Sequence, residues 1–368
     1  MSGSDKSWTQ NSLPLVPTII GALLFFSLLS RAIPQQADPA GKIEWIDVHV
    51  HLIGGRGANA DYEGTAKAAV KAMDEAGIKK SVVMPPPQVS GMPALHDYDS
   101  FISAIRKYPG RFAFLGGGGT LNPMIQDAAG EIHLEDPVRR RFEATADEII
   151  RAGAVGFGEM TAHHLSHTAG HPYESVPADH PLFLVLADRA ARYDVVIDFH
   201  LDLVTEDMDL PSRFSSPPNP SILRANRASF ERFLAHNRKA KVVWAHAGSD
   251  FLGHWTVSLS RQLLRKHPNL YMSLRIGGGV PRNLVFDSGG QIKPAWMDLF
   301  RDFPDRFVIG GDQFFASPLL RGSGPGLLFA QRGSFIRKRM LDFLSRLPAD
   351  LARKIGRDNA HQLYKLKE

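Results

Sequence analysis

The residues that decide the fold are Glu44-Trp45-Ile46-Asp47-Val48-His49-Val50-His51-Leu52. Their β-branched content and strict alternation predict a strand on which residues two apart share a face. One face is apolar and holds Ile46, Val48, Val50 and Leu52. The other face holds Trp45, Asp47, His49 and His51. Two imidazoles at this spacing stand about 6–7 Å apart at their Cα atoms, so both can reach one metal ion with bonds of about 2 Å. The stretch predicts the first half of a metal site.

Composition limits the remaining possibilities. The chain has 368 residues, of which 43% are hydrophobic, enough for one large domain or two ordinary ones. Its net charge of +5 is spread along the sequence without a dense basic run, so we expect no nucleic-acid partner. Cysteine is absent, which excludes disulfides and thiolate ligands. Any metal must therefore be held by His, Asp and Glu.

The N-terminal region carries an apolar run from Leu13 to Leu29, with Lys6 upstream and Ser30-Arg31-Ala32 after it. A run of about 15 residues fits the core of a signal peptide and is short for a membrane span. We predict a signal peptide over residues 1–32, a linker over 33–42 and a folded domain over 43–368. The protein is then exported, to the periplasm or outside the cell. The alternative is an uncleaved membrane anchor at 13–29, the one way in which we expect the chain to meet a membrane.

From Ile43 onward, strand-like and helical patterns alternate. Strands are predicted at 44–52, 80–84, 111–115, 153–159, 194–200, 241–246, 269–275 and 306–311. Helices are predicted at 65–76, 136–152, 181–193, 229–236, 257–267 and 293–303. Eight β/α alternations with mostly parallel strands predict an α/β fold, a (β/α)8 TIM barrel; the alternative is an open doubly wound sheet. The glycine-rich pieces 116–119 and 277–279 are predicted to be tight loops at the barrel mouth.

Four further strands end in a potential metal ligand. These residues are Glu159, His200, His246 and Asp312, on the fourth, fifth, sixth and eighth predicted strands. The C-terminal ends of barrel strands meet at one rim, which is where such barrels place their catalytic groups. The sequence therefore predicts that these four side chains join His49 and His51 at one site.

Other side chains near these strand ends are candidates for supporting roles. Asp47 is either a partner that fixes a histidine tautomer or a structural hydrogen-bond acceptor. His163 and His164, in a histidine-rich stretch after the fourth strand that also holds His167 and His171, are predicted to bind substrate. Arg275 ends the seventh strand and points to an anionic group on the substrate. His254 and Trp255 follow the sixth strand and are weaker candidates for the pocket wall.

The order His49-Val50-His51, Glu159, His200, His246, Asp312 resembles that of the amidohydrolase superfamily of metal-dependent TIM-barrel hydrolases. The closing stretch, residues 354–364, is similar to the C-terminal helix of its amidohydrolase-2 branch, and the resemblance covers about residues 43–366. It implies that His49, His51 and Asp312 hold the more buried metal and that His200 and His246 hold a second, with Glu159 bridging them. Decarboxylases of this branch generally use one metal and lack a ligand on the fourth strand. Glu159 instead resembles the pattern of TatD-type deoxyribonucleases and some phosphotriesterase-like members, which leaves the number of metal ions open.

The chemistry expected of such a site is hydrolysis. A divalent ion, zinc being the best match to mixed His and carboxylate ligands and manganese a second choice, lowers the pKa of bound water toward about 7. Asp312 is the candidate catalytic residue that takes the proton and passes it to the leaving group. We expect cleavage of an ester, lactone, amide or phosphoester bond in a small molecule. The alternatives are a metal-dependent non-oxidative decarboxylase and a metal-loaded binding barrel without turnover; a nuclease is disfavoured by the lack of a basic stripe.

Overall fold

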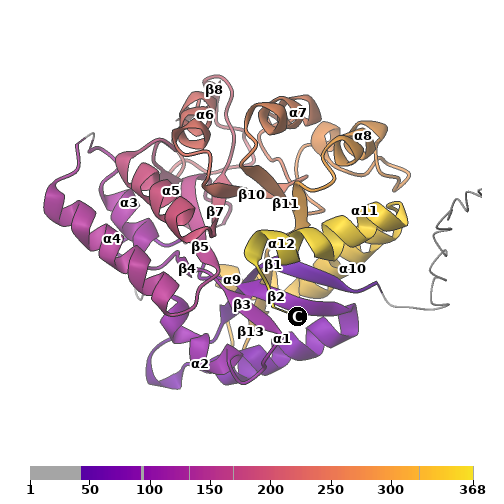
Figure 1. Ribbon diagram of the computed structural model, residues 1–368, viewed down its shortest axis with the longest axis horizontal. Helices are drawn as coiled ribbons and strands as arrows, with labels where there is room; N and C mark the ends of the chain where they lie inside the picture. Colours follow the sequence, from indigo (N-terminus) through magenta and orange to yellow (C-terminus); the bar gives the residue numbers. More distant parts are fainter. Residues whose placement is uncertain (1–42, 93–94, 132, 169, 323, 368) are drawn as a thin grey trace, which may run out of the picture. The chain divides into compact units, whose positions relative to one another are not determined.

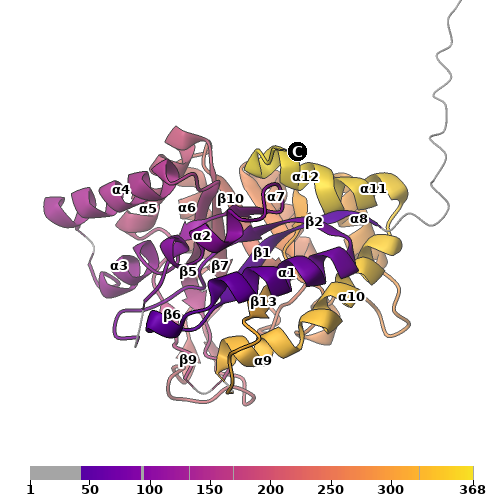
Figure 2. The same ribbon diagram turned by 90° about the horizontal axis from the view of Figure 1, so that it is seen from below.

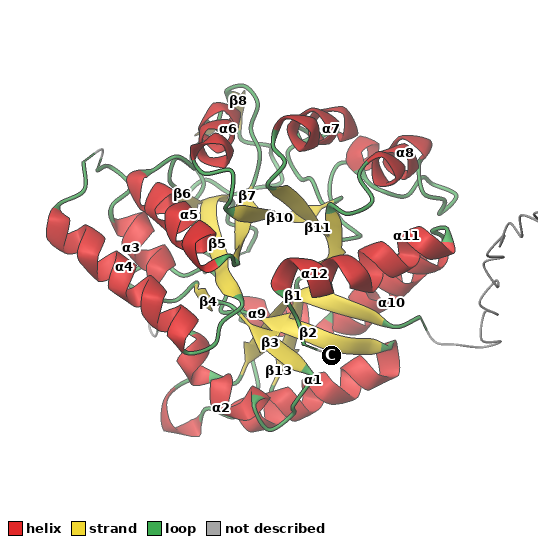
Figure 3. Cartoon of the chain, in the orientation of Figure 1, coloured by secondary structure: helices red, strands yellow, loops and turns green. Residues whose placement is uncertain are grey.

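Strands form the centre of the structure and helices surround them (Figure 1; Figure 3). The computed structural model describes residues 43–92, 95–131, 133–168, 170–322 and 324–367. The predicted signal or anchor segment at 1–32 and the linker at 33–42 lie outside the described residues. No helix in the described ranges is both long enough and apolar enough to span a membrane.

Two sheets contain most of the strands. The first has the order β13-β1-β2-β3, and the second has the order β12-β11-β10-β7-β5-β4 with β6 added beside β5. All these pairings are parallel except that of β5 with β6; a separate antiparallel pair joins β8 and β9. The strands are β1 (Trp45–Ile53), β2 (Ile78–Val83), β3 (Phe112–Phe114), β4 (Gly116–Gly117), β5 (Gly156–His164), β6 (Glu174–Ser175), β7 (Val196–Leu201), β8 (Met208–Asp209), β9 (Ile222–Leu223), β10 (Lys241–Ala247), β11 (Leu270–Leu274), β12 (Phe307–Ile309) and β13 (Gln313–Ala316).

The two sheets are joined through two short chain segments. Only Leu115 separates β3 from β4, and only residues 310–312 separate β12 from β13. At each of these segments the chain passes from one sheet to the other, because β3 and β13 belong to the first sheet and β4 and β12 to the second. The fold is therefore mixed α/β with parallel strands in a TIM-like arrangement, as the alternating sequence pattern predicts.

Helices follow most of the strands. They are α1 (Tyr62–Ala76), α2 (Ile102–Ile105), α3 (Leu121–Asp127), α4 (Asp136–Arg151), α5 (Pro181–Tyr193), α6 (Arg227–His236), α7 (Val257–Lys266), α8 (Pro294–Asp302), α9 (Pro325–Gln331), α10 (Gly333–Ser345), α11 (Ala349–Arg353) and α12 (Asn359–Tyr364). Helix α1 begins three residues before its predicted start because the Asp61 side chain caps it, accepting a 2.7 Å hydrogen bond from the Gly64 N–H. It ends where predicted, before Gly77, which adopts a left-handed backbone.

Strand ends differ from prediction where the backbone turns. The predicted strand 306–311 stops at Ile309, and the chain resumes as β13 after Asp312, which has a left-handed backbone with φ of 50°. The histidine-rich stretch after Glu159 is not a loop at first, because β5 continues to His164. Likewise, Gly116 and Gly117 form β4 instead of a tight loop, and pair with β5.

The predicted alternation along β1 is wrong beyond Val48. Ile46 and Val48 pack in an inner cluster, whereas Val50 and Leu52 pack with Trp45 in the larger cluster shared with the helices. The register between β1 and β2 shifts between Asp47 and Val50. Such an irregularity moves the following side chains to the opposite face.

The inner cluster closes one end of the strand layer. It joins side chains from both sheets to the C-terminal helix, and its members include Ile46, Val48, Val82, Leu115, Val196, Val243, Val308, Ala360, Leu363 and Tyr364. In Figure 2, α12 lies at one end of the described structure, and α9 and β9 lie at the other. The C-terminal helix therefore covers the end opposite to α9, which leaves the α9 end for the site.

Candidate metal centre

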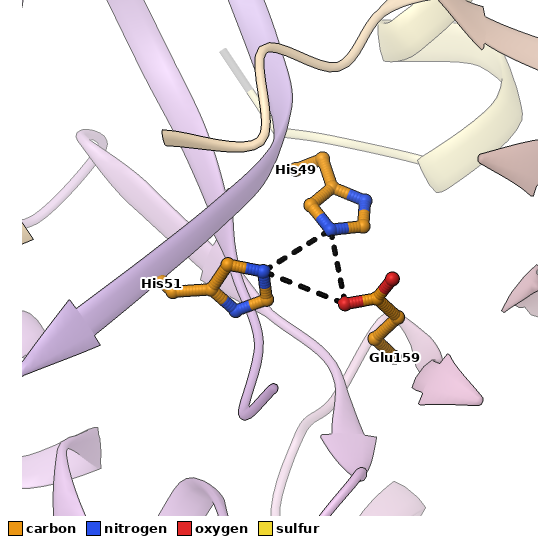
Figure 4. A group of neighbouring side chains, drawn as sticks. All are labelled: His49, His51 and Glu159. Carbon is orange, nitrogen blue, oxygen red and sulfur yellow. Dashed lines mark hydrogen bonds and ion pairs between the residues drawn. The ribbon is translucent and has the colours of Figure 1, made fainter. Parts of the chain in front are cut away.

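His49 and His51 lie on β1 with fully buried side chains. The Nδ1 atom of His49 lies 3.2 Å from a carboxylate oxygen of Asp198 on β7, and Nδ1 of His51 lies 3.0 Å from the carbonyl oxygen of Met84. These acceptors favour a proton on each Nδ1, which leaves both Nε2 lone pairs available. The two Nε2 atoms face each other at 3.2 Å (Figure 4), an arrangement that suits two ligands of one ion.

Glu159 on β5 lies between two pairs of histidines. Its Oε2 atom lies 3.3 Å from Nε2 of His49 and 3.5 Å from Nε2 of His51 (Figure 4). Its Oε1 atom lies 2.8 Å from Nδ1 of His200 and 3.4 Å from Nε2 of His246. Each oxygen of this one carboxylate therefore faces its own histidine pair.

These distances match what a tetrahedral ion requires. Bonds of about 2.0–2.1 Å in a tetrahedron place neighbouring ligand atoms about 3.3–3.4 Å apart, and the atoms of His49, His51 and Glu159 are separated by 3.2 to 3.5 Å. Within the described residues, this group and the group of Glu159, His200 and His246 are the two sets of buried side chains that could hold a metal ion. Their nitrogen and carboxylate atoms are ligands that zinc accepts.

Asp312 lies beside the first group. Its Oδ1 atom is 3.5 Å from Nε2 of His51, and its Oδ2 atom is 3.3 Å from Nη2 of Arg275. Burial would raise the pKa of Asp312, but Arg275 and the neighbouring histidines hold it well below its usual range. Asp312 is therefore a carboxylate at neutral pH, able to accept a proton or bind a cation. Both Asp312 and His246 have left-handed backbones, with φ of 50° and 71°, a conformation that in non-glycine residues concentrates at functional sites.

Charge within the cluster is strongly coupled. Burial alone would lower the pKa of His200, yet hydrogen bonds and charge interactions with Asp202 and Glu159 raise it to about 10. In the same way, Asp198 and Glu159 outweigh burial and raise the pKa of His49, and the histidines lower the pKa of Glu159 well below its usual value. Nearby positive charge therefore stabilises these buried carboxylates, and a divalent ion would supply that charge in place of the protons on the histidines.

The sequence left two roles open for Asp47, a partner of a histidine ring or a structural hydrogen-bond acceptor, and the structure shows the second. Its carboxylate accepts hydrogen bonds from the backbone N–H of Gly311, at 2.8 Å, and of His49, at 3.2 Å, and from the Gln313 side chain. It therefore ties β1 to the segment between β12 and β13. The carboxylate that contacts Nδ1 of His49 belongs to Asp198, which sequence reasoning missed although it stands two residues before His200 on the same strand.

A large cavity opens beside this centre, with a volume of about 940 Å³. Most of the predicted site residues line it, namely His51, Glu159, His164, His200, His246, Arg275 and Asp312. His167, His171 and Trp255 also line it, whereas His254 does not and instead accepts a hydrogen bond from the Thr205 N–H. His164 stands closest to the metal centre among the additional histidines, with its ring centroid 4.0 Å from that of His200.

His163, which the sequence predicts to bind substrate, lies away from the cavity. Its side chain is buried and does not line the cavity. Nδ1 of His163 lies 2.8 Å from the Asp202 carbonyl oxygen, and Nε2 lies 3.3 Å from the Tyr173 hydroxyl. Because β5 continues through His163, adjacent side chains face opposite ways, so only His164 reaches the cavity.

Comparison with known proteins gives a family. The sequence matches the family Amidohydro_2, described as amidohydrolase, over residues 46–366. No curated protein matches the chain.

Three solved structures are similar to the chain at low sequence identity. An amidohydrolase II crystal structure is 17% identical, with 88% of this chain and 100% of that chain covered and a TM-score of 0.48. An amidohydrolase from Burkholderia multivorans with bound zinc is also 17% identical over 88% and 100% of the two chains, with a TM-score of 0.44. A 2,6-dihydroxybenzoate decarboxylase from Rhizobium is 14% identical over 88% and 99%, with a TM-score of 0.43.

Proposed function

Because this chain belongs to the Amidohydro_2 family of amidohydrolases, we propose that it is a metal-dependent hydrolase. Its substrate is a small molecule with an ester, lactone, amide or phosphoester bond. One or two divalent ions, zinc in the first instance, would be held by His49, His51 and Asp312 and by His200 and His246, with Glu159 shared between the two sets.

The observation that carries this proposal is the position of Glu159. One of its oxygens faces His49 and His51, and the other faces His200 and His246, all within 3.5 Å. A carboxylate that only balanced charge would need one such partner. A pair of ions at such a site activates water at neutral pH and polarises the bond to be cleaved.

Side chains of the protein would then transfer the proton from the attacking water to the leaving group. Asp312 is deprotonated at neutral pH and lines the cavity, so it is placed to accept a proton from the attacking water and return it to the leaving group. Arg275 holds the Asp312 carboxylate at 3.3 Å and lines the same cavity, where its charge favours an anionic group on the substrate. Asp198 fixes the ring of His49 by its contact with Nδ1.

Metal analysis joined to a substrate panel tests the proposal. We expect purified protein to contain two ions per chain and to turn over at least one ester, lactone, amide or phosphoester. His49→Ala should lose metal and activity together, whereas His236→Ala, which removes a partly exposed histidine on α6, should keep both. Protein that binds no divalent ion in any condition would contradict the proposal.

The same measurement separates the second candidate, a metal-dependent non-oxidative decarboxylase. That reaction would show one ion per chain and release of carbon dioxide from an aromatic carboxylate. The contact of Glu159 with both histidine pairs favours the hydrolase, because a single ion would leave one oxygen and one pair of histidines without a role.

For the N-terminal segment, we propose export directed by residues 1–32. The apolar run at 13–29, with Lys6 before it and Ser30-Arg31-Ala32 after it, supports this. N-terminal sequencing of protein recovered outside the cytoplasm should find a chain that begins near residue 33. An intact chain held in the membrane fraction would favour the anchor instead.

A further inference from the structure

The cavity is larger than the reacting group requires. Its volume of about 940 Å³ lies at the upper end of the range for small-molecule sites, about 300 to 1,000 Å³. The metal ligands, Arg275 and the histidines occupy one part of its wall. Another part is apolar and comes from β13, α9 and α10, through Phe314, Leu327, Phe329, Phe335 and Ile336.

This apolar wall begins at the metal centre itself. The ring centroid of Phe314 lies 4.5 Å from that of His51, and the ring of Phe329 stacks on Phe314 with centroids 5.4 Å apart. Apolar surface therefore runs without interruption from a metal ligand on β1 to helix α9. Figure 2 shows α9 at the end of the described structure that lies opposite α12.

The outer end of this wall is open to solvent. Phe335 lines the cavity and is nevertheless 60% exposed. Exposed apolar surface that continues into a cavity is typical of a ligand-binding groove, and the exposed ring of Phe335 lines the same cavity as Phe314 and Phe329. Arg275 and Asp312 lie at the metal centre, so the side of the cavity formed by β13, α9 and α10 passes from polar groups at the metal to the exposed Phe335, although Arg56 and Arg332 also line the cavity.

We propose that the substrate is an amphiphile, an acyl compound whose ester, lactone or amide group lies at the metal centre and whose apolar chain extends along Phe314 and Phe329 to Phe335. This rests on the proposed hydrolase function. Hydrolysis adds water across the acyl bond: the water oxygen bonds to the carbonyl carbon, the bond to the leaving oxygen or nitrogen breaks, and the proton passes to the leaving group. No further reactant is needed.

Binding of carboxylates of increasing chain length tests the apolar wall without relying on turnover. The probes are straight-chain carboxylates from acetate to decanoate, titrated by calorimetry into zinc-loaded full-length protein. Complete burial of a methylene group tightens binding about fourfold, so we expect about two- to fourfold tighter binding for each methylene added. A series with no dependence on chain length would overturn the proposal.

Two double variants locate the effect. In the variant that combines Phe329→Ala with Phe335→Ala, the fold increase in affinity for each added methylene should fall toward one. Acetate binding should be unchanged. The matched control is Leu319→Ala with Leu328→Ala, which removes two exposed apolar side chains from the same region that do not line the cavity; it should keep the full gain. An equal gain per methylene in wild type and in the phenylalanine variant would show that the chain binds elsewhere, and would also overturn the proposal.

Turnover of p-nitrophenyl esters with acyl chains from acetate to decanoate separates this inference from the proposed reaction. If neither these esters nor any lactone, amide or phosphoester of the substrate panel is hydrolysed, but the carboxylate series keeps its dependence on Phe329 and Phe335, the hydrolase assignment fails and the apolar subsite stands. If esters are hydrolysed equally fast at every chain length, the hydrolase assignment stands and the amphiphile proposal fails.

Discussion

A carboxylate oxygen of Asp198 lies 3.2 Å from Nδ1 of His49, and both side chains are completely buried. This contact orients the His49 ring so that its Nε2 atom faces Glu159 and His51. Groups that hold a metal-binding histidine in this way typically contribute a factor of about 10 to 100 in metal affinity. We therefore predict that Asp198→Asn, which keeps the shape but removes the charge, weakens metal binding by about that factor in a competition assay with a chelator.

The control for Asp198 is Asp188→Asn. Asp188 also pairs with a histidine, His236, but at the surface. That variant should leave metal affinity unchanged. An equal loss in both variants would mean that Asp198 acts only through overall charge.

Asp312 should be required for turnover more than for metal binding. If it carries the proton between water and leaving group, Asp312→Asn should lower kcat by about 10²–10⁴-fold. Metal content, measured on the same sample, should fall much less, because the histidines and Glu159 remain. Full turnover with metal retained would refute the proton-transfer role.

Arg275 should set the acidic limit of activity. Its charge is the largest influence that lowers the pKa of Asp312, so Arg275→Gln should raise that pKa. The proton-accepting form of Asp312 would then be lost at a higher pH, and the acidic limb of kcat/KM should move to higher pH. Arg275→Lys keeps the charge and should leave the limb close to its wild-type position; an equal move in both variants would point to lost geometry instead.

Asp47 should make the protein less stable as pH rises from about 4 to 6. Burial raises its pKa from 3.8 to about 6, so between these values the folded state keeps a proton that the unfolded state has lost. Stability present below pH 3.8 is therefore lost as pH rises through about 6, by about 3 kcal/mol. Asp47→Asn cannot titrate, so its free energy of unfolding relative to wild type should rise by that amount over this range in urea denaturation. A constant difference between the two proteins would contradict the raised pKa.

Much of the candidate site was predictable because several of its residues follow apolar, strand-like runs in the sequence. Glu159, His200 and His246 each complete an apolar run, and in parallel β/α folds such positions converge at one end. The histidine pair on β1 was predicted instead from its two-residue spacing along a strand, and its two Nε2 atoms lie 3.2 Å apart. The resemblance to amidohydrolases, based on these residues, is confirmed by the family match over 46–366.

The errors come from local backbone irregularities, which periodicity cannot show. The register shift in β1 moves Val50 and Leu52 away from the face of Ile46 and Val48. The eighth predicted strand, 306–311, ends at Ile309, and the chain resumes as β13 only after Asp312, whose backbone is left-handed. The cavity wall formed by α9 was also invisible, because which face of an apolar helix is covered depends on its neighbours in space.

Close packing behind the metal histidines gives a last prediction. A Cβ atom at Gly310 would lie 2.7 Å from the Cβ atom of Ser273 and 3.1 Å from that of His49, so Gly310→Ala should push the β1 and β11 backbones apart. Overpacking of this kind costs about 1–3 kcal/mol, and the displaced His49 should also weaken metal binding. Gly130→Ala meets no atom within 4 Å and serves as the control in thermal unfolding and chelator competition. Because the clash involves His49 itself, stability and metal affinity should fall together in Gly310→Ala; a stable variant with wild-type metal affinity would mean that this part of the barrel relaxes more readily than its packing implies.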